Sequence, residues 1–316
     1  MALDVREEQF CMVISKYRVI QGLALYYSLK KTKSKFRIFI LCIDDETLEI
    51  MKAMIREDVL LISVELLEDD HLSLLRQSRL LEEYCWTLKP VFLEYVLNNY
   101  IDITRITYLD ADLFFYSEPN KIFKGIDEYS ALLSCHDFSR QYTPLNESCG
   151  LYNSGLISFS NNTEGRSCIK WWKDSCYNLC CKQFKNNQFG DQKYLEEMAS
   201  KFSNIKFIKE IGVNTAPWNH SKYVISSIRD CVVINNEKLC CYHFSGFRLV
   251  NKLEFSLNFI NERKPNPILF KPYLQMINQV ISDCQKIRPD IEDCFIAKSE
   301  KKSISLYKIT MFNNSK

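Results

Sequence analysis

Two aspartates, Asp110 and Asp112, have the residue type and spacing in this sequence that point most directly to chemistry. They follow the apolar segment Ile103–Leu109, which is typical of a buried β-strand, and open α/β sheets bind ligands at the carboxyl ends of such strands. In an extended chain, side chains two residues apart point the same way, so both carboxylates can reach one cation. A hard divalent cation often keeps phosphate oxygens as further ligands and neutralises a departing diphosphate. We therefore expect metal-assisted chemistry on a phosphorylated substrate.

The segments around these aspartates alternate between strand and helix patterns, which predicts an α/β fold with a mostly parallel sheet flanked by helices. Strands are expected at Phe10–Ser15, Phe36–Ile43, Leu60–Leu66, Ile103–Leu109, Ala131–Cys135, Gly155–Phe159 and Leu239–His243. Helices are expected at Val19–Leu29, Thr47–Arg56, Leu88–Asn98, Arg166–Cys181, Asp191–Lys201 and Leu274–Lys286. Pro90 would then lie in the first turn of its helix, where proline is tolerated.

The alternation of strands and helices ends near residue 250. The segment Asn261–Pro272 contains three prolines and two asparagines and predicts a loop or linker. We therefore expect a catalytic domain over residues 1–250 and a mainly helical C-terminal extension over residues 251–316. The segment from Arg248 to Lys316 has 12 basic and 7 acidic residues, so peripheral contact with anionic membrane lipid is open beside a solvated surface.

Four motifs resemble, in the same order, those of the retaining GT-A glycosyltransferases of family 8, which include glycogenin and bacterial lipopolysaccharide galactosyltransferases. They are YLDAD at Tyr108–Asp112, YNSGLISF at Tyr152–Phe159, GDQKYL at Gly190–Leu195 and YHFSG at Tyr242–Gly246. The resemblance extends over about residues 10–248. It implies a GT-A, Rossmann-like catalytic domain that uses a nucleotide-sugar donor.

The resemblance also implies a metal site and a catalytic pair. His243 would complete the site with Asp110 and Asp112, and a neutral imidazole beside two carboxylates suits Mn²⁺ (or Mg²⁺). Asp191 would bind hydroxyls of the donor sugar, and Gln192 would lie close to its anomeric carbon. An aspartate at the start of a helix is also an ordinary N-cap, so a structural role for Asp191 is the alternative.

The donor-binding candidates are Tyr17, Lys89, Asp110, Asp112, Asn153, Gly155, Gly246 and Arg248. By resemblance, Asn153 presents polar groups to the donor sugar, and Gly155 permits close backbone approach or simply opens a strand. Lys89 could contact donor phosphate or sugar, or be solvated, and Tyr17 could stack on the base. Arg248 stands where the family has a phosphate-binding lysine, and guanidinium groups suit phosphate oxygens.

The favoured function is transfer of a hexose-type sugar from a nucleoside diphosphate donor, with UDP-sugar favoured, to a saccharide or lipid-linked acceptor. The family implies retention, but a carboxylate base would allow inversion. A non-catalytic sugar- or partner-binding relative and a sugar-phosphate nucleotidyltransferase are the alternatives. The latter lacks support because no glycine-rich phosphate loop follows the first strand.

Composition bounds the setting of this chemistry. With 41 basic and 39 acidic residues, the chain has no global field for nucleic acid, so we expect no nucleic-acid partner. The 14 cysteines lie mostly in apolar or helical stretches and show no zinc spacing, which favours free thiols in a reducing compartment. Neither a secretory signal nor an apolar run of membrane-spanning length is recognisable. We expect a cytoplasmic enzyme of polysaccharide biosynthesis, and peripheral contact with the inner face of the membrane is left open.

Overall fold

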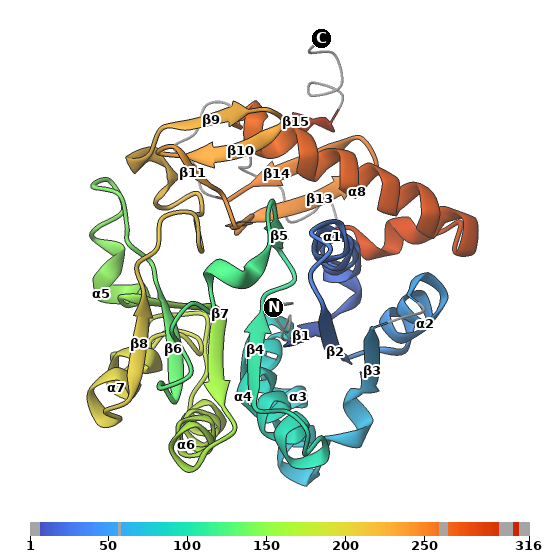
Figure 1. Cartoon of the computed structure of the whole chain (residues 1–316). Coiled ribbons are helices and arrows are strands. Elements are labelled where there is room, and N and C mark those ends of the chain that lie inside the picture. Colours follow the sequence, from blue (N-terminus) through green and yellow to red (C-terminus); the bar gives the residue numbers. More distant parts are fainter. Residues whose placement is uncertain (1–6, 56–57, 259–264, 297–305, 310–316) are drawn as a thin grey trace.

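A seven-stranded sheet is the centre of the computed structural model, which describes residues 7–55, 58–258, 265–296 and 306–309 (Figure 1). The strand order is β3-β2-β1-β4-β7-β6-β8. Neighbouring strands pair in parallel except at β7, which is antiparallel to both β4 and β6. The expected α/β class with a mostly parallel sheet is therefore confirmed.

The strands of this sheet are β1 (Glu8–Ile14), β2 (Phe36–Cys42), β3 (Val59–Ser63), β4 (Arg105–Leu109), β6 (Ala131–Cys135), β7 (Tyr152–Ser160) and β8 (Ile205–Ile208). The helices are α1 (Val19–Lys31), α2 (Asp45–Met54), α3 (Asp70–Ser78), α4 (Leu81–Asn99), α5 (Leu145–Cys149), α6 (Thr163–Asn178), α7 (Tyr194–Lys201) and α8 (Pro267–Ile287). Three smaller sheets pair β5 (Leu113–Phe115) with β12 (Cys241–His243), β9 (Ile225–Ile228) with β10 (Cys231–Ile234) and β11 (Glu237–Lys238), and β13 (Phe247–Asn251) with β14 (Glu254–Leu257) and β15 (Leu306–Lys308).

Both faces of the central part of the main sheet are buried, which explains why β1, β2 and β4 are largely apolar. In β1, Phe10 and Met12 join a core that includes α1, α2 and α8, whereas Cys11 and Val13 join a second core that includes α4 and α6. Successive side chains of a strand point to opposite faces, so a strand covered by helices on both sides has no polar alternation.

Short polar side chains fix the starts of several helices around the sheet. Asp44 accepts a hydrogen bond from the backbone N–H of Thr47 at the start of α2, and Asn162 does the same for Gly165 at the start of α6. Such caps satisfy backbone donors that a helix leaves free at its first turn. The caps place each helix start close to the end of the preceding strand.

Two helices begin seven residues before their expected starts. Helix α4 begins at Leu81 rather than Leu88, so Pro90 lies inside the helix and leaves the Trp86 carbonyl without its helical N–H donor. Helix α8 begins at Pro267, so the second half of the expected linker is helical, with Pro272 in the helix interior. Both prolines are tolerated because packing of the apolar helix faces outweighs one lost hydrogen bond. Residues 261–264 of that linker lie outside the described part.

The C-terminal elements pack on the main sheet layer rather than apart from it. Leu269, Tyr273 and Ile277 of α8 belong to the same apolar core as Leu23 and Leu29 of α1. Strand β13 crosses the expected boundary at residue 250, and the division into two domains stays a prediction.

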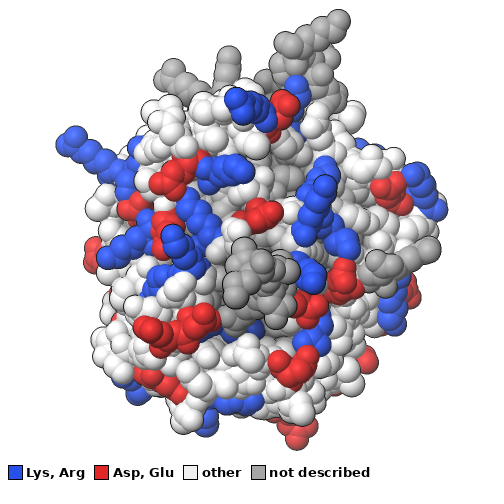
Figure 2. Space-filling view, in the orientation of Figure 1, with Lys and Arg blue, Asp and Glu red and all other residues white. Residues whose placement is uncertain are grey.

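Three further features concern membrane spans, surface charge and cysteines. No helix within the described residues is long and apolar enough to cross a membrane. Acidic and basic side chains are interspersed on the face shown in Figure 2. All 14 cysteines lie in the described part of the chain and are free thiols.

Candidate active site

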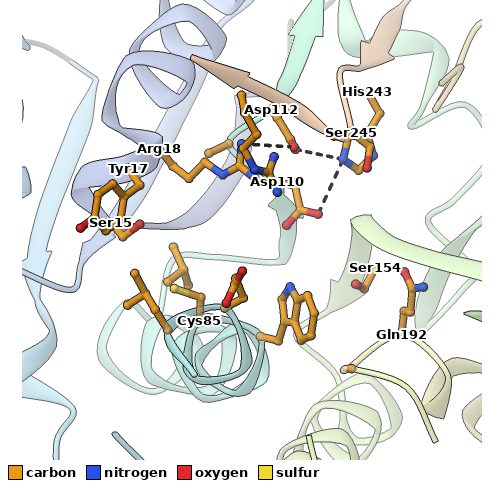
Figure 3. Close-up of a pocket in the computed structure, with 18 of the residues that line it drawn as sticks. Ser15, Tyr17, Arg18, Cys85, Asp110, Asp112, Ser154, Gln192, His243 and Ser245 are labelled. Atoms are coloured by element: carbon orange, nitrogen blue, oxygen red, sulfur yellow. Dashed lines mark hydrogen bonds and ion pairs between the residues drawn. The ribbon is translucent and has the colours of Figure 1, made fainter. Parts of the chain in front are cut away.

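A cavity of about 1130 Å³ opens where β1 and β4 end, and it is lined by segments from the whole length of the chain (Figure 3). Of the predicted site residues, all but Gly155 line this cavity: Tyr17, Lys89, Asp110, Asp112, Asn153, Asp191, Gln192, His243, Gly246 and Arg248. Its position at the carboxyl ends of parallel strands is where open α/β folds bind their ligands.

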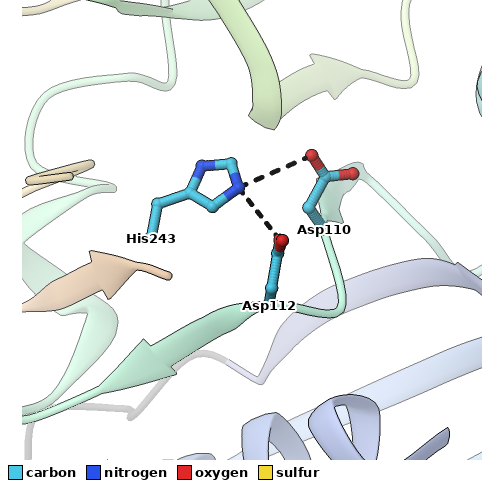
Figure 4. A group of neighbouring side chains, drawn as sticks. All are labelled: Asp110, Asp112 and His243. Atoms are coloured by element: carbon cyan, nitrogen blue, oxygen red, sulfur yellow. Dashed lines mark hydrogen bonds and ion pairs between the residues drawn. The ribbon is translucent and has the colours of Figure 1, made fainter. Parts of the chain in front are cut away.

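Asp110, Asp112 and His243 form a compact cluster at the centre of the cavity wall (Figure 4). Each offers one ligand atom, and these atoms all lie within 4.8 Å of one another. The Nε2 atom of His243 is 3.0 Å from Oδ1 of Asp112 and 3.8 Å from Oδ2 of Asp110. Two carboxylate oxygens and one imidazole nitrogen are a donor set that suits Mn²⁺, so the residues present fit a divalent metal.

A turn, rather than an extended chain, brings the two aspartates together. The backbone N–H of Leu113 donates to the carbonyl of Asp110, which closes a tight turn between β4 and β5. His243 reaches the cluster because β12 pairs antiparallel with β5, with His243 opposite Leu113. The predicted convergence of the two carboxylates is therefore correct, but the backbone between them is a turn and not the extended chain that was expected.

Burial and charge act in opposite directions on Asp112. Burial alone would raise the pKa of this carboxyl, but the neighbouring His243 and the guanidinium groups of Arg18 and Arg248 outweigh it and hold the pKa well below its usual range. Asp112 is therefore ionised at neutral pH, the form in which it can bind a metal. The Nδ1 atom of His243 is buried without a hydrogen-bond partner among the described residues.

Gly155 lies directly behind the cluster and not in the cavity wall. A Cβ atom added there would lie 2.4 Å from Cε1 of His243 and 2.8 Å from Oδ2 of Asp110. The backbone of Gly155 also accepts a hydrogen bond of 2.7 Å from the N–H of Asp110. A glycine is thus required by the close approach of β7 to the cluster, which is a stronger reason than the opening of a strand.

Lys89 is a buried hub between two carboxylates. Its Nζ atom is 2.9 Å from Oδ1 of Asp110, 3.3 Å from Oδ2 of Asp191 and 3.0 Å from Oγ of Ser154. Burial alone would lower the pKa of Lys89, but Asp110 and Asp191 outweigh it and raise the pKa. Lys89 is only 3% exposed, so the solvated alternative is wrong. It links the metal cluster to Asp191.

Asp191 and Gln192 line the cavity on the segment before α7. The helix begins at Tyr194 with Lys193 as its N-cap, so Asp191 does not cap it. The carbonyl of Asp191 accepts a hydrogen bond from the indole N–H of Trp172. Burial raises the pKa of Asp191, and Lys89 partly offsets this. Gln192 Oε1 accepts a bond of 3.4 Å from the amide of Asn153.

The cavity wall beside Tyr17 contains a basic residue that no sequence motif indicates. Arg18, four residues after β1, is 4.0 Å from Oδ2 of Asp112. Its neighbour Tyr17 is 38% exposed at the cavity edge. Gly246 has a positive φ of 80°, which favours glycine and turns the chain so that Arg248 also faces the cavity.

An aromatic wall lies on the other side of the metal cluster. The imidazole of His136 stacks on Phe138 at 4.5 Å, and Trp218 packs edge-on against both His136 and His243. Burial lowers the pKa of His136 to about 3, so it is neutral at physiological pH. This wall was not predictable from the sequence, because scattered aromatic residues carry no local signal before folding brings them together.

Comparison with known sequences gives two relatives of nearly full length, the uncharacterized proteins YfnF and YfnD of Bacillus subtilis. YfnF is 35% identical over 300 residues, which cover 93% of this chain and 99% of YfnF. The chain belongs to the family of YfnF and YfnD. YfnD is 30% identical over 294 residues, which cover 92% of this chain and 94% of YfnD. No family model matches the sequence of this family member.

Solved structures identify the fold of this YfnF-like chain. The galactosyltransferase LgtC, in complex with donor and acceptor sugar analogues, superposes with a TM-score of 0.51 and 13% identity, covering 75% of this chain and 87% of LgtC. An active-site mutant of LgtC gives a TM-score of 0.55 and 11% identity, covering 87% and 95%. The chain therefore has the GT-A glycosyltransferase fold, and the expected likeness to family 8 is confirmed.

Proposed function

We propose that this protein is a metal-dependent glycosyltransferase that moves a hexose-type sugar from a nucleoside diphosphate donor, with UDP-sugar favoured, to a saccharide or lipid-linked acceptor. The observation that carries the proposal is the Asp110–Asp112–His243 cluster, whose ligand atoms lie within 4.8 Å of one another in the wall of a large cavity of a GT-A fold. The structure of LgtC with donor and acceptor sugar analogues supports a cavity that takes both substrates.

In this proposal Asp110, Asp112 and His243 hold Mn²⁺ or Mg²⁺. The metal, when bound, supplies positive charge that stabilises the departing diphosphate. Asp112 is ionised through its contacts with His243 and Arg18, and Lys89 fixes the carboxylate of Asp110. These contacts orient the ligands before the metal binds, which lowers the ordering cost of binding.

The donor sugar would lie between the metal cluster and the segment of Asp191 and Gln192. Lys89 holds Asp191 in place, so one carboxylate oxygen stays oriented for sugar hydroxyls. The amide of Asn153 positions Gln192. The crystal structure of an active-site mutant of LgtC in which a glutamine is replaced by glutamate supports a site role for an amide in this fold. Gln192 is our candidate for the group nearest the anomeric carbon.

The acceptor would enter from the side of the aromatic wall formed by His136, Phe138 and Trp218. Indole and phenyl faces pack well against the apolar faces of sugar rings. His136 is neutral and its Nδ1 is held by the carbonyl of Gly150, so it is a poor general base. A poor general base at His136 agrees with the retention that the family resemblance implies. We place the reaction in the cytoplasm, in the biosynthesis of a surface polysaccharide or lipid-linked saccharide.

The test is turnover and binding of a panel of nucleotide sugars with and without Mn²⁺. We expect one donor to be hydrolysed slowly, with the activity lost in EDTA and in Asp112→Asn, and the released sugar to keep its anomeric configuration by NMR. Asp174→Asn, which removes an exposed surface carboxylate, is the matched control and should keep full activity. If the wild type neither binds nor turns over any nucleotide sugar with metal present, the proposal fails and a binding or scaffolding role is the better account.

A further inference from the structure

Two arginines from distant parts of the chain meet at one carbonyl in the cavity wall. Nη1 of Arg18 donates to the carbonyl of Phe247 at 3.1 Å, and Nη1 of Arg248 donates to the same oxygen at 2.9 Å. Because both Nη1 atoms bind the same oxygen, the two guanidinium groups lie close to each other. Arg18 follows β1, whereas Arg248 lies in β13, so only the fold brings them together.

We propose that Arg18 and Arg248 form a two-arginine clamp for the diphosphate of the donor, with Arg18 as a binding residue that the motifs do not indicate. This inference rests on the proposed function and adds to it a second, metal-independent contact with the leaving group. An anion with two phosphate groups would accept charged hydrogen bonds from both guanidinium groups, and such bonds are stronger than those between neutral groups.

The position of the clamp fits a diphosphate that also touches the metal cluster. Arg18 is 4.0 Å from Oδ2 of Asp112, and both arginines line the cavity. The carbonyl of Phe247 and the carboxylate of Asp112 hold the guanidinium of Arg18. The side chain is 24% exposed, so part of it still faces the cavity. Figure 3 shows Arg18 between Tyr17, the candidate for stacking on the base, and Asp112 of the metal cluster.

The guanidinium groups have a chemistry that a lysine at either position would not reproduce. Each presents a planar fork of N–H donors, which can bind two phosphate oxygens while a further N–H keeps its bond to the carbonyl. One arginine per phosphate group would hold the diphosphate in one orientation. A nucleoside monophosphate can engage only part of such a clamp, so the clamp should favour diphosphates over monophosphates.

The experiment measures binding of nucleoside diphosphates and monophosphates by calorimetry, in Mn²⁺ and in EDTA, with UDP, CDP, GDP and dTDP as probes. In EDTA the wild type should keep measurable affinity for one diphosphate, and Arg18→Gln and Arg248→Gln should each weaken it by about 10- to 100-fold, the value of a charged hydrogen bond. The loss for the matching monophosphate should be smaller. Arg18→Lys should recover part of the affinity because it restores charge without the fork.

Controls separate the clamp from a structural role for Arg18. Arg229→Gln removes an exposed arginine in the turn between β9 and β10 and should bind as the wild type does. Thermal melting shows whether Arg18→Gln is folded, and Arg248→Gln tests the clamp from the other strand. Arginine variants that are folded and bind the diphosphate as tightly as the wild type would overturn the clamp while leaving the glycosyltransferase proposal intact. A wild type that binds no diphosphate even with Mn²⁺ would overturn both.

Discussion

Gly155 lies so close to the metal cluster that one added carbon atom would disturb two of its three members. In Gly155→Ala the new Cβ would lie 2.4 Å from His243 and 2.8 Å from Asp110, so the cluster must open. We expect the affinity for Mn²⁺ to fall by about 10- to 100-fold, as for other changes next to metal ligands. Calorimetric titration with Mn²⁺ measures this directly. The free energy of unfolding should fall by about 1–3 kcal/mol through overpacking.

Gly22→Ala is the matched control for this prediction. Its added Cβ would also meet a neighbour, Cδ1 of Ile14 at 2.3 Å, but that atom is the end of a flexible side chain and lies away from the metal cluster. We expect this variant to change stability alone and to bind Mn²⁺ as the wild type does. A Gly155→Ala protein with wild-type Mn²⁺ affinity would show that the cluster is more adaptable than its packing indicates.

At the residue scale, site residues were predictable where they belong to one local motif. They were not predictable where their partners are distant in the sequence. The spacing of Asp110 and Asp112 and their position after an apolar strand were sufficient to predict their convergence. The buried state of Lys89 was not predictable, because its two carboxylate partners lie far from it in the sequence and the charge is stable only when both are present. Arg18 was missed for the same reason, since its partner carbonyl is that of Phe247.

At the scale of elements, helix α8 supports the turn that carries Gly246. The ring of Tyr273 stacks on Phe244 with centroids 3.7 Å apart and an interplanar angle of 8°, and it meets Phe247 edge-on. Tyr273 is fully buried. The residues on either side of Gly246 are therefore held by one side chain of α8.

Two substitutions of Tyr273 distinguish what its ring and its hydroxyl group each contribute to the free energy of unfolding. We expect Tyr273→Ala to lower the free energy of unfolding by about 3–5 kcal/mol because it removes a large buried ring. The hydroxyl oxygen of Tyr273 is buried and has no hydrogen-bond partner among the described residues, so Tyr273→Phe should be neutral or slightly stabilising. Urea unfolding of both variants measures the difference. A large loss in Tyr273→Phe would reveal a hydrogen bond of this hydroxyl and contradict the account.

Elements were predictable where hydrophobic period and length agree, as in β1, α1 and β2. The short strands β9, β10 and β11 were not predicted, since four residues or fewer carry too little periodicity and are stabilised by pairing with each other. The start of α4 was placed too late because a proline was taken to mark the first turn. Its real start is at Leu81, where the carboxylate of Glu83 accepts a bond from the N–H of Leu80.

At the scale of the whole molecule, the cavity depends on segments from both ends of the chain. Ser15 and Arg18 from the first elements and Glu292 and Phe295 after α8 line the same space. The same apolar core joins α1 with α8. Residues on both sides of position 250 therefore share one cavity and one apolar core. Whether residues 1–250 fold independently of residues 251–316 is still to be tested.

Acid stability is the whole-molecule property that the buried histidines should control. Burial lowers the pKa of His220 from 6.5 to about 4, and its Nδ1 is 2.7 Å from the hydroxyl of Tyr242. Between these two pKa values the imidazole of the unfolded chain binds a proton that the folded chain excludes. Protonation therefore favours the unfolded chain, so the free energy of unfolding is highest above about pH 6.5 and falls as the pH is lowered toward 4. From pH 7 to pH 5 the loss from His220 should be about 2 kcal/mol. In urea unfolding across this range, His220→Gln should show a shallower decline than the wild type. Tyr242→Phe keeps the histidine and removes its partner hydroxyl, so its free energy of unfolding should fall with pH as steeply as that of the wild type. A decline in His220→Gln as steep as the wild type's would mean that other groups set the acid sensitivity.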